Sequence, residues 1–273
     1  MTESRLVAAP ATYSKDDPGY PERLRRRLTR PALLHVLGDL DLLSATPALA
    51  VAGSRAAPAR SLEDAAQLGA ECARRGWLVI SGGARGVDTS AVEGALAAGG
   101  RAVVVLAEGI ETGKGRALLR RFAGHRFAVV SQFAPRAGWK SWQAMARNGL
   151  ILAFSDALVA VAFGEGGERP DSPGTLSKQA LSGTLDAVIK ATGFAGKPGW
   201  EDFAGAWSLS PIPRSERQPV DGGAVHSATS PAAAIAEIAA RLVAAAPANS
   251  LPATRTGGEV DEPTQPPLFV VER

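Results

Sequence analysis

Two short segments of this sequence combine glycine, serine and arginine, the residues whose backbone amides, hydroxyls and guanidinium groups bind negatively charged oxygen. Gly53-Ser54-Arg55 follows one apolar run, and residues 81–88 follow the next. Packing alone hardly justifies three glycines in five positions, whereas close approach of a ligand to the backbone would. The chemistry that both segments predict is therefore phosphate binding. The second segment contains Ser81, Gly82, Gly83, Arg85, Gly86 and Asp88.

Both segments stand between a predicted strand and a predicted helix. Apolar strands alternating with amphipathic helices are typical of a doubly wound parallel sheet, which binds ligands at the carboxyl ends of its strands. We therefore expect an α/β fold, a doubly wound Rossmann-like parallel sheet with small N-terminal and C-terminal additions, and the two turns side by side. The expected strands are 49–53, 77–81, 101–106, 126–131, 157–162 and 186–191, and the expected helices are 59–75, 88–98, 115–122, 139–154 and 175–182.

The chain divides into four predicted parts. These are a small N-terminal segment at 1–45, a Rossmann-like domain at 46–195, an accessory region at 196–246 and a disordered tail at 247–273. The tail is rich in Pro, Thr, Gly and acidic residues, a composition that cannot bury a core. A basic helix in the first segment is open to two interpretations, a solvated helix face or a phosphate-contacting patch. Its arginines are Arg23, Arg25, Arg26, Arg27 and Arg30.

Composition limits the class of protein. The chain has 273 residues, 45% of them hydrophobic, and a net charge of +3, which tolerates a polyanionic partner without requiring one. Cys72, the only cysteine, is expected in the core, and it excludes an intramolecular disulfide and a cysteine-based zinc site. Residues 1–10 lack a long apolar stretch, and no run reaches the roughly 18–20 residues that span a bilayer. We expect a cytoplasmic protein without a membrane partner.

Known nucleotide motifs fit poorly. The P-loop pattern GxxxxGK[ST] is absent, and Gly82-Gly83-x-x-Gly86 does not match GxGxxG, so a hydride-transfer enzyme has little support. Asp88 can cap the helix that follows it. We expect no catalytic residue, no metal and no cofactor, although the question of enzymatic activity stays open.

The sequence resembles the DprA/Smf DNA-processing family. The resemblance is carried by Val51-Ala52-Gly53-Ser54-Arg55 and by 81–88 with Ala91, Ala95 and Leu96 following. It continues through Tyr20-Pro21, Arg147-Asn148-Gly149 and Gly174-Thr175, in the family's order over roughly residues 18–195. That family belongs to the Rossmann-like group that also holds the LOG phosphoribohydrolases.

The resemblance implies a non-catalytic protein that binds single-stranded DNA, loads a recombinase, acts in natural transformation and DNA recombination, and forms a homodimer. Binding of this kind is largely independent of base sequence and weakens with salt. Carried over residue by residue, the phosphate-binding positions are Gly53, Ser54, Arg55, Gly82, Gly83, Arg85, Gly86, Lys140, Arg147, Gly174 and Thr175.

Several positions depart from the family pattern, which indicates a divergent member. Val92 replaces the family's histidine, and Gly149 replaces the second arginine of its Arg-Asn-Arg segment. The family's phenylalanine before that segment is missing, while Trp139 and Trp142 stand nearby. Both base stacking and core packing stay open for these tryptophans.

A second interpretation uses the same glycine-rich pocket for a small nucleotide, in a sensor or a LOG-like nucleotide phosphoribohydrolase. The LOG motif PGGxGTxxE is interrupted here, and Lys178 occupies the place of its glutamate. Glu165 or Asp88 would have to supply the missing carboxylate. A groove that continues past the pocket would favour a strand, and a closed pocket would favour a mononucleotide.

The C-terminal residues fit a peptide motif for protein binding. Gln265, Leu268 and Phe269 match the Gln-x-x-Leu-Phe pattern of peptides that bind the bacterial sliding clamp. Chance, or an apolar tail that folds back on the core, is the alternative, because five-residue patterns recur by accident.

Overall fold

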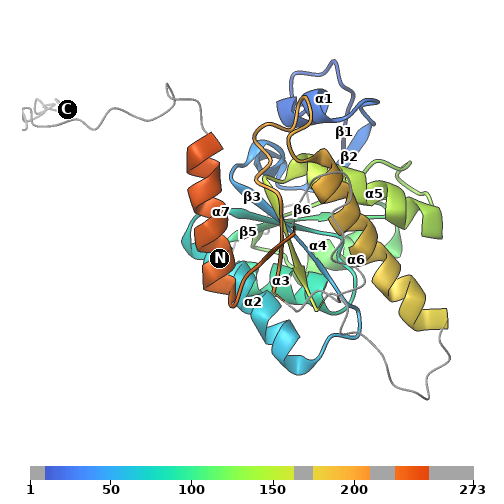
Figure 1. Ribbon diagram of the computed structural model, residues 1–273. Helices are drawn as coiled ribbons and strands as arrows, with labels where there is room; N and C mark the ends of the chain where they lie inside the picture. Colours follow the sequence, from blue (N-terminus) through green and yellow to red (C-terminus); the bar gives the residue numbers. More distant parts are fainter. Residues whose placement is uncertain (1–9, 163–174, 210–224, 246–273) are drawn as a thin grey trace, which may run out of the picture.

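The computed structural model describes residues 10–162, 175–209 and 225–245 (Figure 1), and in the helix from Thr175 it describes side chains at 184 and from 186 onward. The strands are β1 Ala11–Tyr13, β2 Leu34–Gly38, β3 Ala48–Gly53, β4 Leu78–Ser81, β5 Arg101–Val105, β6 Arg126–Ser131, β7 Ala157–Val161, β8 Ala206–Ser208 and β9 Val225–Ser227. The helices are α1 Glu22–Arg27, α2 Ala59–Arg74, α3 Val87–Ala97, α4 Gly113–Arg121, α5 Ser141–Phe154, α6 Thr175–Phe194 and α7 Pro231–Ala245, with a 3-10 helix η1 at Leu40–Ser44.

One sheet runs through the described part of the chain in the order β1-β2-β6-β5-β4-β3-β7-β8-β9. From β6 to β9 in this order the neighbouring strands are parallel, and only β2 and β1 are antiparallel to their neighbours. The chain builds β3 to β6 outward in one direction and then returns along α5 to place β7 on the free side of β3. This reversal confirms the predicted doubly wound Rossmann-like class, and it marks the edge where such folds bind ligands.

Helices cover both faces of this sheet (Figure 1). Helices α2, α3, α4 and α7 share one apolar layer, and α1, α5 and α6 share the other. Alternation along β3 supplies both layers, because Ala50 packs with the second group and Leu49 with the first. Cys72 lies buried in α2, as expected, and burial raises the pKa of its thiol to about 12.

The N-terminal and C-terminal additions extend the sheet at its two edges. β2 pairs with β6 and β1 with β2, while β8 and β9 follow β7 on the other side. Helix α7 packs against α2. The four-part division of the chain stays a prediction. None of the helices in the described ranges is long and apolar enough to cross a membrane.

The predicted strand at 186–191 is wrong, because these residues belong to α6. Thr184, Ala187, Val188 and Ala191 are buried at spacings of three and four, whereas Ile189 is 39% exposed. That pattern is the helical period of 3.6 and not the period of two that a strand requires. The short apolar run around Val188 suggested a strand because a run of that length fits either element.

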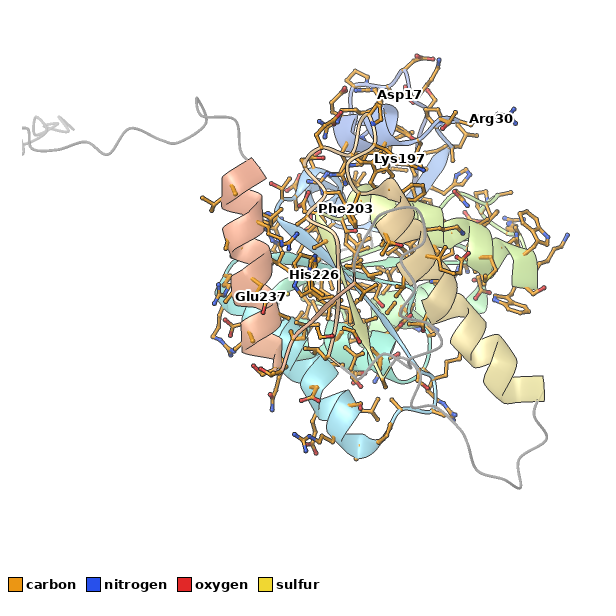
Figure 2. All side chains as sticks on the ribbon, viewed as in Figure 1. Asp17, Arg30, Lys197, Phe203, His226 and Glu237 are labelled. Atoms are coloured by element: carbon orange, nitrogen blue, oxygen red, sulfur yellow. The ribbon has the colours of Figure 1, made fainter. Side chains whose placement is uncertain are left out.

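The arginines of α1 do not form one surface. The side chain of Arg27 is fully buried and pairs with Asp202 at 2.6 Å, and Arg23 pairs with the buried Asp156 at 3.6 Å. Both earlier interpretations are therefore wrong for Arg23 and Arg27, because α1 packs on the end of α5 and turns these side chains inward. Arg30, which follows α1, points away from the molecule in the view of Figure 2.

Replacing the buried arginine of α1 should weaken the fold. We expect Arg27→Met to lower the free energy of unfolding by about 3 kcal/mol, because it leaves Asp156 buried beside one cation fewer. Arg26→Met is the matched control, since Arg26 pairs with Asp202 at the surface and should cost less than about 1 kcal/mol. Urea denaturation measures both variants, and equal losses would contradict the assignment.

Candidate nucleic-acid interface

Two adjoining cavities lie at the carboxyl ends of β3 and β4, under α5. The larger, about 360 Å³, is called the apolar cavity because its wall includes Val51, Ile151 and Leu158. The smaller, about 270 Å³, is called the cationic cavity because four cations line it and no carboxylate of the described ranges does; the cations are Arg55, Arg85, Lys114 and Arg147. The residues common to both are Arg55, Gly82, Ala84, Trp139, Ala144 and Arg147.

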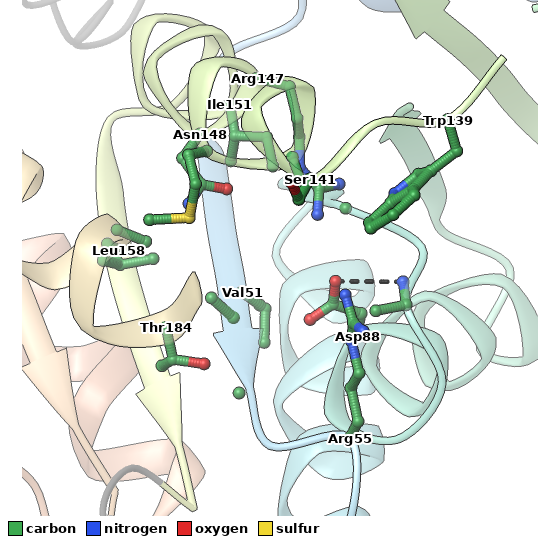
Figure 3. A pocket seen from close by; sticks show the side chains of 17 residues that line it. Val51, Arg55, Asp88, Trp139, Ser141, Arg147, Asn148, Ile151, Leu158 and Thr184 are labelled. Atoms are coloured by element: carbon green, nitrogen blue, oxygen red, sulfur yellow. Dashed lines mark hydrogen bonds between the residues drawn. The ribbon is translucent and has the colours of Figure 1, made fainter. Parts of the chain in front are cut away.

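Arg55 reaches into this site from the turn after β3. Its guanidinium points toward Arg147 across the apolar cavity, with Asp88 between them (Figure 3). The preceding Ser54 is buried, and its hydroxyl accepts a hydrogen bond from the Ala56 amide at 3.1 Å. The Ser54 hydroxyl therefore shapes the turn that aims Arg55.

The two glycine-containing turns contact each other, which confirms that they lie side by side. The Val87 amide donates to the Ser54 carbonyl at 3.3 Å. Gly86 has a φ of +87°, and a Cβ at this position would overlap the Ser54 carbonyl oxygen. A glycine is thus required both by the backbone conformation and by the approach of the first turn.

Arg147 ties α5 to the middle of the sheet. It is 8% exposed, and its Nη1 donates a hydrogen bond to the Val105 carbonyl at 2.7 Å. Its guanidinium lies directly against Gly82, where a Cβ would overlap it. Arg147 therefore fixes the position of the β4 turn relative to α5.

The glycines of the two turns have packing reasons, contrary to the argument from sequence that packing hardly justifies them. A Cβ at Gly83 would come within 2.5 Å of Val104, and a Cβ at Gly53 would overlap the Val161 carbonyl. Sequence alone does not show these contacts, because they join residues far apart in the chain. Phosphate binding by these glycines stays a prediction.

Asp88 supports the second turn from within. Its Oδ2 accepts a hydrogen bond from the Ala84 amide at 3.2 Å (Figure 3). It lies in the first turn of α3, and the N-cap residue of this helix is Gly86, so the expected capping role is wrong. Burial raises the pKa of the Asp88 carboxyl, and the nearby Arg147 guanidinium opposes that shift.

Lys114 is a site residue that the sequence analysis missed. It stands in the first turn of α4, after β5, and lines the cationic cavity. The protein atoms around its ammonium, followed by the positive charge of Arg147, lower the pKa of Lys114. The signal was present, since Gly113-Lys114 repeats after a third strand the glycine–cation combination of the first two turns.

Trp139 and Trp142 are at the surface, so the core-packing interpretation is wrong for both. Trp139 is 54% exposed and lines both cavities, whereas Trp142 is 59% exposed and meets the ring of Phe133 edge-on at 5.6 Å. Lys140, between them, is exposed and lines neither cavity. Apolar surface beside a cavity is typical of a binding site.

Of the predicted site residues, five line the cavities: Gly53, Arg55, Gly82, Arg85 and Arg147. Ser54, Gly83, Gly86 and Lys140 line neither cavity. Two others have no described side chain. Gly174 lies outside the described residues. Thr175 begins α6, and its side chain is likewise outside the described part. The tail residues Gln265, Leu268 and Phe269 also lie outside it.

Fold and site together define a Rossmann-like protein with a cavity lined by arginines and a lysine at the strand-order reversal. The sequence profile of the DNA recombination-mediator protein A family matches residues 11–169. The chain belongs to this family.

Individual relatives agree with that assignment. The chain is 34% identical over 153 residues to the DNA processing protein DprA of Streptococcus pneumoniae, covering 54% of this chain and 52% of that one. It is 29% identical over 145 residues to DprA of Bacillus subtilis, covering 52% and 48%. The chain thus spans about half the length of the curated relatives it matches.

Solved structures support the fold. The structure of S. pneumoniae DprA matches with a TM-score of 0.62 and 23% identity, over 86% of this chain and 75% of that chain. Helicobacter pylori DprA, described for its unique single-stranded DNA binding mode, matches with a TM-score of 0.56 and 20% identity. This match covers 75% of the present chain and 82% of the H. pylori chain.

Adding a methyl group at position 82 should displace Arg147. We expect Gly82→Ala to lower the free energy of unfolding by about 1–3 kcal/mol, because the new Cβ overlaps the guanidinium. Gly149→Ala, within α5 and with open space at its Cβ, should instead raise the free energy of unfolding by about 0.5–1 kcal/mol. Urea denaturation measures both, and a stabilising Gly82→Ala would contradict the contact.

The buried carboxyl of Asp88 should leave a pH signature. Because burial raises its pKa, the folded protein holds this proton more tightly than the unfolded chain. Its contribution to stability is therefore present at low pH and lost as the pH rises through the raised pKa. We expect Asp88→Asn to gain stability relative to the wild type in thermal denaturation as the pH rises above about 4, the ordinary pKa of an aspartate. A difference independent of pH would contradict this assignment.

Proposed function

We propose that this protein binds single-stranded DNA without base specificity along the edge formed by the two cavities. The observation that carries the proposal is the convergence of Arg55 and Arg147 on a cavity walled by the exposed Trp139. Arginines bind phosphate oxygens, and an exposed indole stacks on any base. Membership of the family, and the single-stranded DNA binding described for the H. pylori protein, support the same conclusion.

The shape of the site favours a strand over a single nucleotide. The apolar cavity opens into the cationic cavity through residues common to both, so the site continues beyond the first pocket. An apolar space next to a basic one suits the alternation of base and phosphate along a strand. The proposed binding residues are Gly53, Ser54, Arg55, Gly82, Gly83, Arg85, Gly86, Lys140, Arg147, Gly174 and Thr175.

The biological setting is proposed from the family. A DNA recombination-mediator protein would act in DNA processing and recombination, including natural transformation, in the cytoplasm. Its proposed partners are a recombinase and a second copy of this chain. Size-exclusion chromatography with light scattering tests the dimer, and a single mass equal to one chain would reject it.

A small-nucleotide function is the second candidate. The buried Asp88 carboxyl beside Arg55 and Arg147 is the observation that favours it, since its raised pKa suits proton transfer. Its Oδ2 accepts the Ala84 amide, however, which assigns it a role in holding the turn. Release of base from a nucleoside monophosphate, followed by chromatography, would support the hydrolase and count against a non-catalytic protein.

The sliding clamp is proposed as a further partner, through Gln265, Leu268 and Phe269. The motif is the whole support for this proposal. Isothermal titration of a peptide of residues 265–273 against the clamp tests it, with a peptide carrying alanine at 268 and 269 as control. No heat from the first peptide would reject the motif.

Arg55 should contribute one phosphate contact. We expect Arg55→Gln to weaken binding of an oligothymidylate about tenfold and to reduce the slope of log affinity against log salt by about one. Trp139→Ala should weaken binding by a similar factor, about 1–3 kcal/mol, with little change in the salt slope. Fluorescence anisotropy at several salt concentrations measures both quantities.

Arg60→Gln is the charge-matched control, because Arg60 is exposed at the start of α2 and lines neither cavity. Arg60→Gln should change the affinity for the oligothymidylate and the salt slope only slightly. If Arg55→Gln and Arg60→Gln behave alike, the binding is not centred on the cavities and the proposal fails.

A further inference from the structure

The cationic cavity carries more positive charge than one internal phosphate needs. Arg55, Arg85, Lys114 and Arg147 come from the ends of three neighbouring strands and from α5, and among the described residues no carboxylate lines the cavity with them. A phosphodiester in a strand carries a single negative charge. The excess must therefore be explained by another feature of the ligand.

Three of these cations are uncompensated. Arg55, Arg85 and Lys114 make neither a hydrogen bond nor an ion pair within the part of the chain that the structure describes. Some exposed arginines elsewhere have partners, as Arg74 has with Glu71, whereas the side chains of Arg60 and Arg116 make neither a hydrogen bond nor an ion pair within the described residues. The three cations differ from these because they line one cavity together. The carboxylate of Asp88 partly neutralises Arg147.

Repulsion within the cluster is visible at Lys114. Besides burial, the charges of Arg147 and Arg55 lower the pKa of its ammonium, while Glu108 and Asp88 act in the opposite direction from beyond ion-pair distance. An anion bound among the three free cations would relieve this repulsion. A doubly charged anion would relieve more of it than a singly charged one.

We propose that the cationic cavity binds a terminal phosphomonoester, either the 5′-phosphate of a strand or the phosphate of a free nucleotide. Such a group carries a charge of about −1.5 to −2 at neutral pH and three acceptor oxygens. Three cations on three different turns match three oxygens better than they match the two free oxygens of a phosphodiester. For a strand, this inference rests on the proposed function.

The neighbouring apolar cavity would hold the base of the same nucleotide. Trp139 belongs to the walls of both cavities, so a base against its ring stands next to the cations. Val51, Ile151 and Leu158 supply apolar contact, and Asn148 and Thr184 are the polar groups nearby. A terminal nucleotide can enter both cavities without the chain having to leave on its 5′ side.

The test compares one oligothymidylate with a 5′-phosphate and with a 5′-hydroxyl, by fluorescence anisotropy on the full chain. We expect the phosphorylated strand to bind about three- to tenfold more tightly, the worth of one further charge-assisted contact. Lys114→Gln should remove this preference, so that the two strands bind the variant with equal affinity. Lys114 is exposed, so the variant should fold, and circular dichroism checks this.

Arg116→Gln is the matched control on the same helix, because Arg116 is exposed and lies outside both cavities. It should keep the preference for the 5′-phosphate. Equal binding of the two strands would reject the strand end as the source of the phosphate and leave the proposed function intact. A preference that survives Lys114→Gln would overturn the assignment of the phosphate to the cationic cavity.

A second arm separates the two sources of phosphate. Isothermal titration with thymidine monophosphate and with thymidine should give heat for the nucleotide alone, and Lys114→Gln should abolish it. If neither strand binds, the proposed function fails, but heat from the nucleotide would still support the phosphomonoester site. No heat from the nucleotide, together with equal binding of the strands, would reject it.

Discussion

The site depends on one packing contact, in which the Arg147 guanidinium lies against the backbone of Gly82. Helix α5 carries the chain back across the sheet to β7, and this return creates the reversal of strand order beside β3. Arg147 fixes that helix to the centre of the sheet through the Val105 carbonyl. A side chain at position 82 would push the guanidinium away, so glycine here serves the internal anchor before it serves any ligand.

This anchor also determines how charge is distributed. A guanidinium buried at the carboxyl ends of the strands needs a counter-charge, and the buried Asp88 supplies it. Asp88 is in turn held by the Ala84 amide, within the turn that carries Arg85. Asp88 thus acts on Arg147 through its charge, without an ion pair between them in the described residues, and the Nε of Arg147 has no hydrogen-bond partner there. Arg55, Arg85 and Lys114 remain available to an external anion.

Local patterns predicted the framework of this site, and long-range contacts supplied the rest. Apolar runs located the Rossmann strands, because a strand buried on both faces leaves a continuous signal. The apolar run around Val188 led to the wrong prediction of a strand, because a buried helix can also contain a short continuous apolar run. Arg27 is buried and Trp139 is exposed because of how elements distant in the sequence pack together. Residue spacing along the chain carries no information on that packing. Lys114 joins the site only because β5 neighbours β4.

Two features that do not favour folding lie next to each other in this site, and their proximity supports the proposed ligand. The exposed indole of Trp139 gains little from folding, because half of it stays in water. The unpaired cations of the cationic cavity repel one another, which opposes folding as well. A simple anion would offset the second cost and leave the first, and an apolar molecule would do the reverse. A nucleotide offsets both, since its base covers an aromatic ring while its phosphate neutralises the charge.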